Sequence, residues 1–150
     1  MTKLLPDQLK KQTRLLGRWT IRQLNGRSVL YTTNLGSLIK FHVQNSPELK
    51  INVLNNGNPQ LTPQFWAVRV NRGPWQRWSV QESSFELKLP NQADIEIMTA
   101  GNTDLDDVWL GNQGLALAEI EFADHATITP AKPLKRIAII GDSITAGCWV

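Results

Sequence analysis

Alternation of apolar and polar residues dominates the middle of the chain. It is clearest in residues 49–54 and 85–89, where every second side chain is apolar. Successive side chains of a strand point to opposite faces, so this period predicts half-buried β-strands. Turn signals such as Asn25-Gly26 and the Asn- and Pro-containing segment 55–59 separate the alternating runs. About nine short strands are expected, over residues 19–22, 28–32, 37–43, 49–54, 65–70, 75–80, 85–89, 93–98 and 115–122.

This spacing of short strands and turns predicts an all-β fold, specifically a jelly-roll-like β-sandwich over residues 17–129. No repeat of 20–50 residues is visible, which argues against a solenoid or a propeller. Residues 1–16 are expected to form an N-terminal arm or a short helix. Pro6 suits a first helical turn and Gly17 suits a helix end, so a helix over 6–16 and an extended arm both remain open.

The end of the chain has a different pattern. Residues 130–136 form a Pro-containing linker, and four apolar residues then run from Ile137 to Ile140 before Gly141. A short apolar run that stops at a glycine predicts a buried parallel strand of an α/β domain. A serine on the following turn, Ser143, would lie beside backbone N–H groups of a helix start, which is the arrangement that acyl transfer needs. The alternative is a strand end where Asp142 or Ser143 only caps a helix.

The segment Gly141-Asp142-Ser143-Ile144-Thr145-Ala146-Gly147 resembles the first sequence block of the SGNH (GDSL-type) hydrolases. The order of Leu16-Gly-Arg-Trp19, Gly36-Ser37, a long β region, a linker and this block is similar to carbohydrate esterase family two. The resemblance implies a β-sandwich that packs against a flavodoxin-like SGNH domain, of which residues 137–150 supply the first strand and the nucleophile turn. It also implies an acylated carbohydrate or another small ester as substrate. Ser143 would be the nucleophile and a backbone oxyanion donor, and Asp142 would order the turn.

A serine nucleophile needs a base, and the two histidines of the chain, His42 and His125, both precede Ser143. The resembled family supplies its base far after the serine, so both histidines are expected to be ordinary sandwich residues. The later blocks of the family have no counterpart in these 150 residues. The chain alone is therefore expected to lack esterase activity. Its apolar strand 137–140 is expected to be disordered, to add to a sheet edge, or to self-associate.

Composition and charge exclude several classes of function. Hydrophobic residues make up 41% and charged residues 19%, a globular balance, and the net charge of +3 is scattered, which argues against nucleic-acid binding. The lone Cys148 excludes an intramolecular disulfide, and the acidic segment 104–107 lacks the further oxygen ligands of a calcium loop. No metal, no cofactor and no membrane partner are predicted. The polar N-terminus predicts a cytoplasmic protein, or a secreted one if a leader was removed.

Six tryptophans raise a second hypothesis, carbohydrate binding by stacking on aromatic rings. Trp75 and Trp78, flanked by Arg72 and Arg77, are the best though weak candidates. Their odd spacing places them on opposite faces of a regular strand, and core packing is the competing explanation for each. The alternative function is accordingly a non-catalytic sandwich that binds carbohydrate or packs against another domain.

Overall fold

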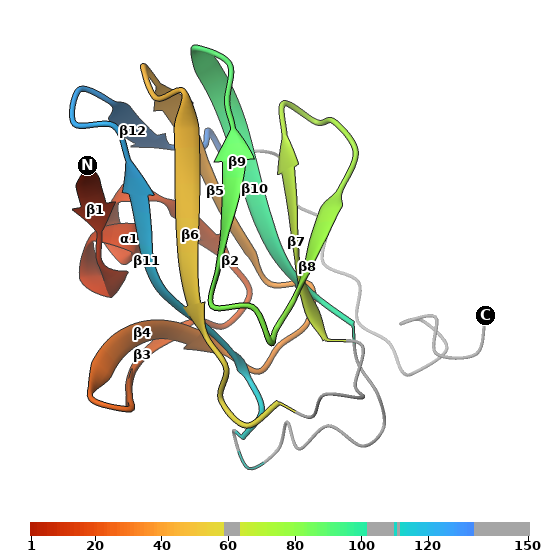
Figure 1. The fold of residues 1–150 in the computed structure, drawn as a ribbon. Helices are drawn as coiled ribbons and strands as arrows, with labels where there is room; N and C mark the ends of the chain where they lie inside the picture. The colour runs from red at the N-terminus through yellow and green to blue at the C-terminus, as the bar shows by residue number, and fades with distance from the viewer. Residues whose placement is uncertain (59–63, 102–109, 111, 134–150) are drawn as a thin grey trace.

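Two antiparallel sheets stack face to face in the computed structural model, which describes residues 1–58, 64–101, 110 and 112–133 (Figure 1). Sheet A has the order β3-β4-β11-β6-β9, with β1 also paired to β11, and sheet B has the order β12-β5-β10-β7-β8, with β2 also paired to β5. From β4 to β7 and again from β8 to β12 the chain alternates between the sheets, as in a jelly roll. The predicted all-β sandwich is thereby confirmed. The strands of sheet A are β1 (Thr2–Leu4), β3 (Thr20–Leu24), β4 (Arg27–Thr32), β6 (Glu48–Leu54), β9 (Ser84–Lys88) and β11 (Leu115–Phe122); those of sheet B are β2 (Arg14–Leu16), β5 (Leu38–Gln44), β7 (Phe65–Val70), β8 (Gln76–Ser79), β10 (Gln92–Ala100) and β12 (Thr127–Pro130).

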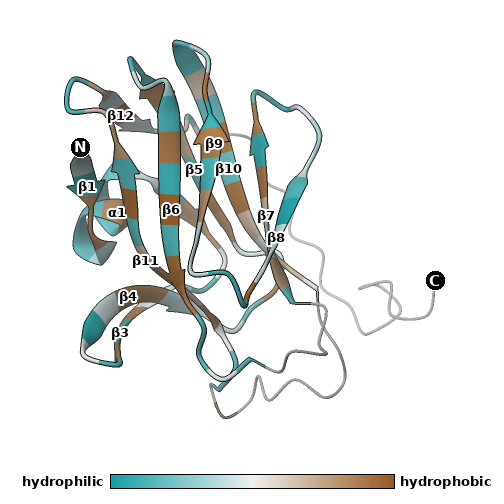
Figure 2. Cartoon of the chain, in the orientation of Figure 1, coloured by the Kyte–Doolittle hydropathy of each residue, from teal (hydrophilic) through white to brown (hydrophobic). Residues whose placement is uncertain are grey.

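The core lies between the sheets and follows the alternation read from the sequence, visible as brown and teal bands along β6 and β10 (Figure 2). Each central strand sends every second side chain inward, and these side chains are almost fully buried. Such burial of apolar area is the main force that holds two sheets together. The largest fully buried members include Trp66, Phe41, Leu30, Ile51, Ile95 and Leu117.

A β-bulge interrupts the alternation in β11. The register against β6 shifts between Leu117 and Glu119, so Leu117 and Ile120 both belong to the core. Glu119 and Glu121 then lie beside β1, where Lys3 Nζ is 2.7 Å from Glu119 Oε1. A hydrogen bond from Asn52, with help from Lys3, lowers the pKa of Glu121. The N-terminal strand is therefore fastened to sheet A by charged pairs as well as by its ladder.

The N-terminal segment, residues 1–16, pairs with both sheets of the sandwich, through β1 with sheet A and through β2 with sheet B. Helix α1 (Pro6–Gln12) begins with Pro6 as expected and buries Leu9 completely in the core. It ends before the predicted stop, because Thr13 turns extended and Arg14–Leu16 pair with one half of β5. The other half of β5 pairs with β12, whose last residue, Pro130, is the first residue of the predicted linker.

All nine expected strands are present as β3 to β11, and each observed end lies within two residues of its predicted position. The strands that the sequence did not indicate are β1, β2 and β12, each three or four residues long. Strands this short contain too few positions for a period of two to be recognised. They form because the edges of β5 and β11 offer unpaired backbone groups that need partners.

Gly114 offers a test of how tightly the start of β11 packs. Its N–H donates to the hydroxyl of Tyr31 at 2.9 Å, and an added Cβ would lie 2.7 Å from the carbonyl oxygen of Thr32. We expect Gly114→Ala to lower the free energy of unfolding by about 2 kcal/mol, measured by urea denaturation. Gly36→Ala is the comparison, since Gly36 has open space around it and the substitution there adds only the cost of a positive φ of 72°, about 1 kcal/mol. A Gly114→Ala midpoint equal to that of the unsubstituted protein would contradict this account of the packing.

Candidate functional site

The outer surface of sheet B carries a group of charged side chains that border a hollow. Residues of β5, β10 and β7 that alternate with core residues point away from the core and stand next to one another across the strands. The register aligns Glu96 with Lys40 on one side and with Arg69 on the other, and aligns Asp94 with His42. We call this surface the charged face, made of Lys40, His42, Arg69, Asp94 and Glu96.

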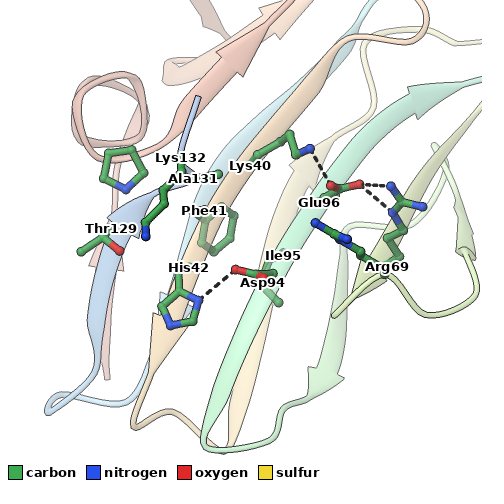
Figure 3. A pocket seen from close by; sticks show the side chains of 12 residues that line it. Lys40, Phe41, His42, Arg69, Asp94, Ile95, Glu96, Thr129, Ala131 and Lys132 are labelled. Atoms are coloured by element: carbon green, nitrogen blue, oxygen red, sulfur yellow. Dashed lines mark hydrogen bonds and ion pairs between the residues drawn. The ribbon is translucent and has the colours of Figure 1, made fainter. Parts of the chain in front are cut away.

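Glu96 is the electrostatic centre of the charged face. Lys40 Nζ lies 2.6 Å from its Oε1, and Arg69 Nε donates to its Oε2 at 2.6 Å, as the dashed lines of Figure 3 show. Only 13% of the Glu96 side chain is exposed, so water screens these pairs incompletely. Partial burial opposes ionisation, but the hydrogen bonds from Lys40 and Arg69 prevail and lower the pKa of Glu96. The carboxylate therefore holds two cations in fixed positions on the sheet.

His42 and Asp94 form a second pair one row away. Asp94 Oδ1 lies 2.9 Å from His42 Nδ1 (Figure 3). The other ring nitrogen, Nε2, lies 3.3 Å from the side-chain nitrogen of Gln44. A carboxylate on Nδ1 orients an imidazole and leaves Nε2 as the acceptor, which is the arrangement of a general base. In the described part of the chain, however, Nε2 faces Gln44 rather than a nucleophile. The pair can orient a bound group by hydrogen bonding. His42 lies on the outer side of its strand, as the alternation predicts.

A hollow of about 640 Å³ opens over this surface, between the charged face and the segment that follows β12. Figure 3 shows Thr129, Ala131 and Lys132 on one side of it and Arg69 with Glu96 on the other. The volume falls within the roughly 300–1,000 Å³ of small-molecule sites. The wall is mixed, since Phe41, Ile95, Pro130 and Ala131 contribute apolar surface beside the charged groups.

The two tryptophans proposed for sugar stacking lie on opposite faces. Trp78 pairs with Trp66 across β8 and β7, and it stacks on Phe85 with ring centroids 4.6 Å apart, so it fills the edge between the two sheets. Trp75 lies on the outer side, where the guanidinium of Arg69 sits 4.5 Å from its ring centroid. One face of Trp75 is therefore already covered by a cation. The structure brings Trp75 next to the charged face and places Trp78 in the packing.

The remaining predicted residues are distributed as follows. Ser143 and Asp142 lie outside the described residues, as do the strand 137–140 and the acidic segment 104–107. His125 is exposed in the turn between β11 and β12. In the described ranges, no three potential metal ligands from His, Cys, Asp and Glu gather together, and no helix is long and apolar enough to cross a membrane.

Sequence reasoning did not single out Lys40, Arg69, Asp94, Glu96 or the residues after β12. Each is a charge at an outward position of a predicted strand, and such charges are usually solvated. The useful signal would have been the register, because it aligns opposite charges on three neighbouring strands. Register between strands distant in sequence cannot be read from alternation alone.

Comparison with known proteins finds likeness in structure only. No protein-family model matches the sequence, and no curated protein matches it significantly. Three solved structures share the fold: a family two carbohydrate esterase from Cellvibrio japonicus (20% identity, TM-score 0.66, 97% of this chain and 40% of that chain), a salicylyl-acyltransferase from a tetracycline biosynthetic pathway (13% identity, TM-score 0.62, 90% and 43%), and a carbohydrate esterase whose active site displays divergent catalytic and non-catalytic binding functions (9% identity, TM-score 0.52, 83% and 33%). The chain thus spans between one third and slightly more than two fifths of the length of these proteins.

Proposed function

We propose that this chain is the β-sandwich part of a serine ester hydrolase of the SGNH type that acts on an acylated carbohydrate. Ser143 is the nucleophile in this proposal, its own N–H is one donor to the oxyanion, and Asp142 orders the turn that presents it. The sandwich serves as the accessory domain beside the catalytic one.

The observation that carries the proposal is the coincidence of a fold and a sequence motif. In structure, 97% of this chain matches 40% of a family two carbohydrate esterase, and residues 141–147 resemble the Gly-Asp-Ser block of the SGNH hydrolases. The structural match rests on how the backbone is arranged, whereas the resemblance of the block rests on residue types. A salicylyl-acyltransferase with the same sandwich supports acyl transfer as the common chemistry.

The chemistry of the serine indicates which domain supplies the catalytic base. A hydroxyl becomes a good nucleophile only when a base accepts its proton. In the described residues the imidazole with the geometry of a base, His42, is engaged with Asp94 and Gln44 on the outer surface of sheet B. We therefore assign the base to the catalytic domain, whose remaining part corresponds to the unmatched three fifths of the family two esterase.

Two polypeptides test this assignment. The 150-residue chain is compared with the product of the complete reading frame, which the proposal expects to be longer. We expect the longer product to hydrolyse 4-nitrophenyl acetate and acetylated oligosaccharides and the 150-residue chain to remain at the background rate. Ser143-dependent turnover by the 150-residue chain would overturn the assignment of the base, and absence of turnover by both would overturn the proposed hydrolase.

A further inference from the structure

The turn between β7 and β8 has an unusual residue in a strained position. Asn71 and Arg72 have φ values of 51° and 60°, and the N–H of Gly73 donates to the carbonyl of Val70 at 2.9 Å. Two successive left-handed residues closed by this hydrogen bond form a tight turn of type I′. Asparagine tolerates the left-handed region, whereas a long side chain such as arginine occupies it at a cost of about 1 kcal/mol or more.

The same chain shows the unstrained solution elsewhere. The hairpin between β3 and β4 turns at Asn25 and Gly26, with φ values of 51° and 75°. Arg72 thus stands where a glycine stands in the equivalent turn. The second turn is also held rigidly, since the Asn71 side-chain oxygen accepts from the Asp94 N–H at 2.7 Å and the Asn71 N–H donates to the Asp94 carbonyl at 2.9 Å. This anchoring fixes the turn, and with it Arg72, at the rim of the hollow.

The charges of the hollow are unbalanced. Counted over Lys, Arg, Asp and Glu, its lining has four cationic side chains against two acidic ones, an excess of two positive charges. Glu96 is engaged by Lys40 and Arg69, and Asp94 by His42. Across the described ranges, Arg72 and Lys132 have no ion pair or hydrogen-bonded side-chain partner, and both are exposed. Two unpaired cations at one mixed, partly apolar hollow are suited to an organic acid group.

We propose that this hollow binds an acidic sugar, a uronic acid unit of a saccharide, with Arg72 pairing with its carboxylate and Lys132 adding positive charge from the opposite wall. The second carboxylate oxygen of the exposed Asp94 and the hydroxyl of Thr129 are available for its hydroxyl groups, and Pro130 and Ala131 supply apolar surface for the C–H side of the ring. The turn places the planar, permanently charged guanidinium of Arg72 at the lining of the hollow. The choice of a saccharide rests on the proposed function, whereas recognition of the acid group rests on the charges of the hollow.

Binding is measured on the isotope-labelled 150-residue chain by NMR titration with D-glucuronate, D-glucose and acetate at constant pH and ionic strength. We expect glucuronate to shift the ring signals of His42 and to bind about tenfold more tightly than either glucose or acetate, since only glucuronate offers both the charge and the hydroxyl groups. Arg72→Gly should weaken glucuronate binding by about tenfold. Its melting temperature should not fall, because the substitution creates the unstrained Asn-Gly turn. Arg18→Ala, which removes an exposed cation that does not line the hollow, should change neither quantity.

The outcomes separate cleanly. If glucuronate and acetate bind with equal affinity, the assignment of a saccharide is wrong. If glucuronate and glucose bind with equal affinity, the recognition of the acid group is wrong. If Arg72→Gly binds glucuronate as tightly as the unsubstituted chain, the role of Arg72 is wrong. No shift with glucuronate would overturn the proposal as a whole. Because the readout is binding and not ester hydrolysis, failure here is distinguishable from failure of the proposed hydrolase.

Discussion

Replacing Ser143 by alanine in the product of the complete reading frame should reduce ester hydrolysis at least about a thousandfold, with folding unaffected. The reason is that alanine lacks the oxygen that attacks the ester carbonyl, while the backbone N–H at this position remains in place. The proposed covalent acyl-enzyme cannot form without that oxygen. Hydrolysis of 4-nitrophenyl acetate, followed at saturating substrate, measures the effect.

Ser83→Ala is the matched control for this substitution. Ser83 is exposed immediately before β9, and its backbone carbonyl accepts from the N–H of Val53 at 3.0 Å, so the substitution removes no part of this hydrogen bond. Its loss should leave the rate unchanged. Retention of more than about a tenth of the activity by Ser143→Ala would show that another residue is the nucleophile, and the terminal Gly-Asp-Ser block would then be a helix cap.

The second large effect concerns stability. We expect Glu96→Gln to lower the free energy of unfolding by about 2 kcal/mol at pH 7, because Lys40 and Arg69 would be left on a half-buried surface without their carboxylate. Urea denaturation measures it. Glu86→Gln is the control: Glu86 is 65% exposed and lies 3.7 Å from Lys50, so its loss should cost less than about 0.5 kcal/mol.

The difference in free energy of unfolding between the unsubstituted protein and Glu96→Gln should become smaller as the pH falls. The pKa of Glu96 in the folded state lies below its ordinary value of 4.5, so the folded state favours the ionised carboxylate. The stabilisation is therefore fully present above pH 4.5 and is lost as the pH falls through the lower folded-state pKa. Denaturation curves of the two proteins should converge under acidic conditions, and a constant difference down to that range would contradict the ion-pair explanation.

Much of the sandwich could be predicted from alternation. A strand that buries one face has an apolar residue at every second position, and this pattern is visible in the sequence. Residues 49–54 show this directly, since Leu49, Ile51 and Val53 are buried and Lys50 and Asn52 are not. The turn at Asn25-Gly26 could also be predicted from the sequence, because its left-handed backbone favours these residue types. Helix α1 was located at its start but not at its end, where pairing of Arg14–Leu16 with β5 prevails over local helix preference.

The candidate site illustrates the opposite case. Lys40, Arg69 and Glu96 are separated by 27 residues or more along the chain, and nothing in the local pattern relates one to another. Arg72 drew attention only as a neighbour of Trp75, and its left-handed backbone and its place at the hollow depend on the hydrogen bonds from Asn71 to β10. Those bonds join segments that only the folded sheet brings together.

The sequence by itself determined the class of fold, the side of each long strand that faces the core, and the chemical candidate Ser143, because each depends on residue type and local spacing. The tertiary structure alone decided which charges become neighbours, that Trp78 packs while Trp75 faces outward beside Arg69, and where a hollow forms. The physical reason is that alternation constrains which face a residue occupies, whereas strand order and register, set by the whole core, determine what stands beside it.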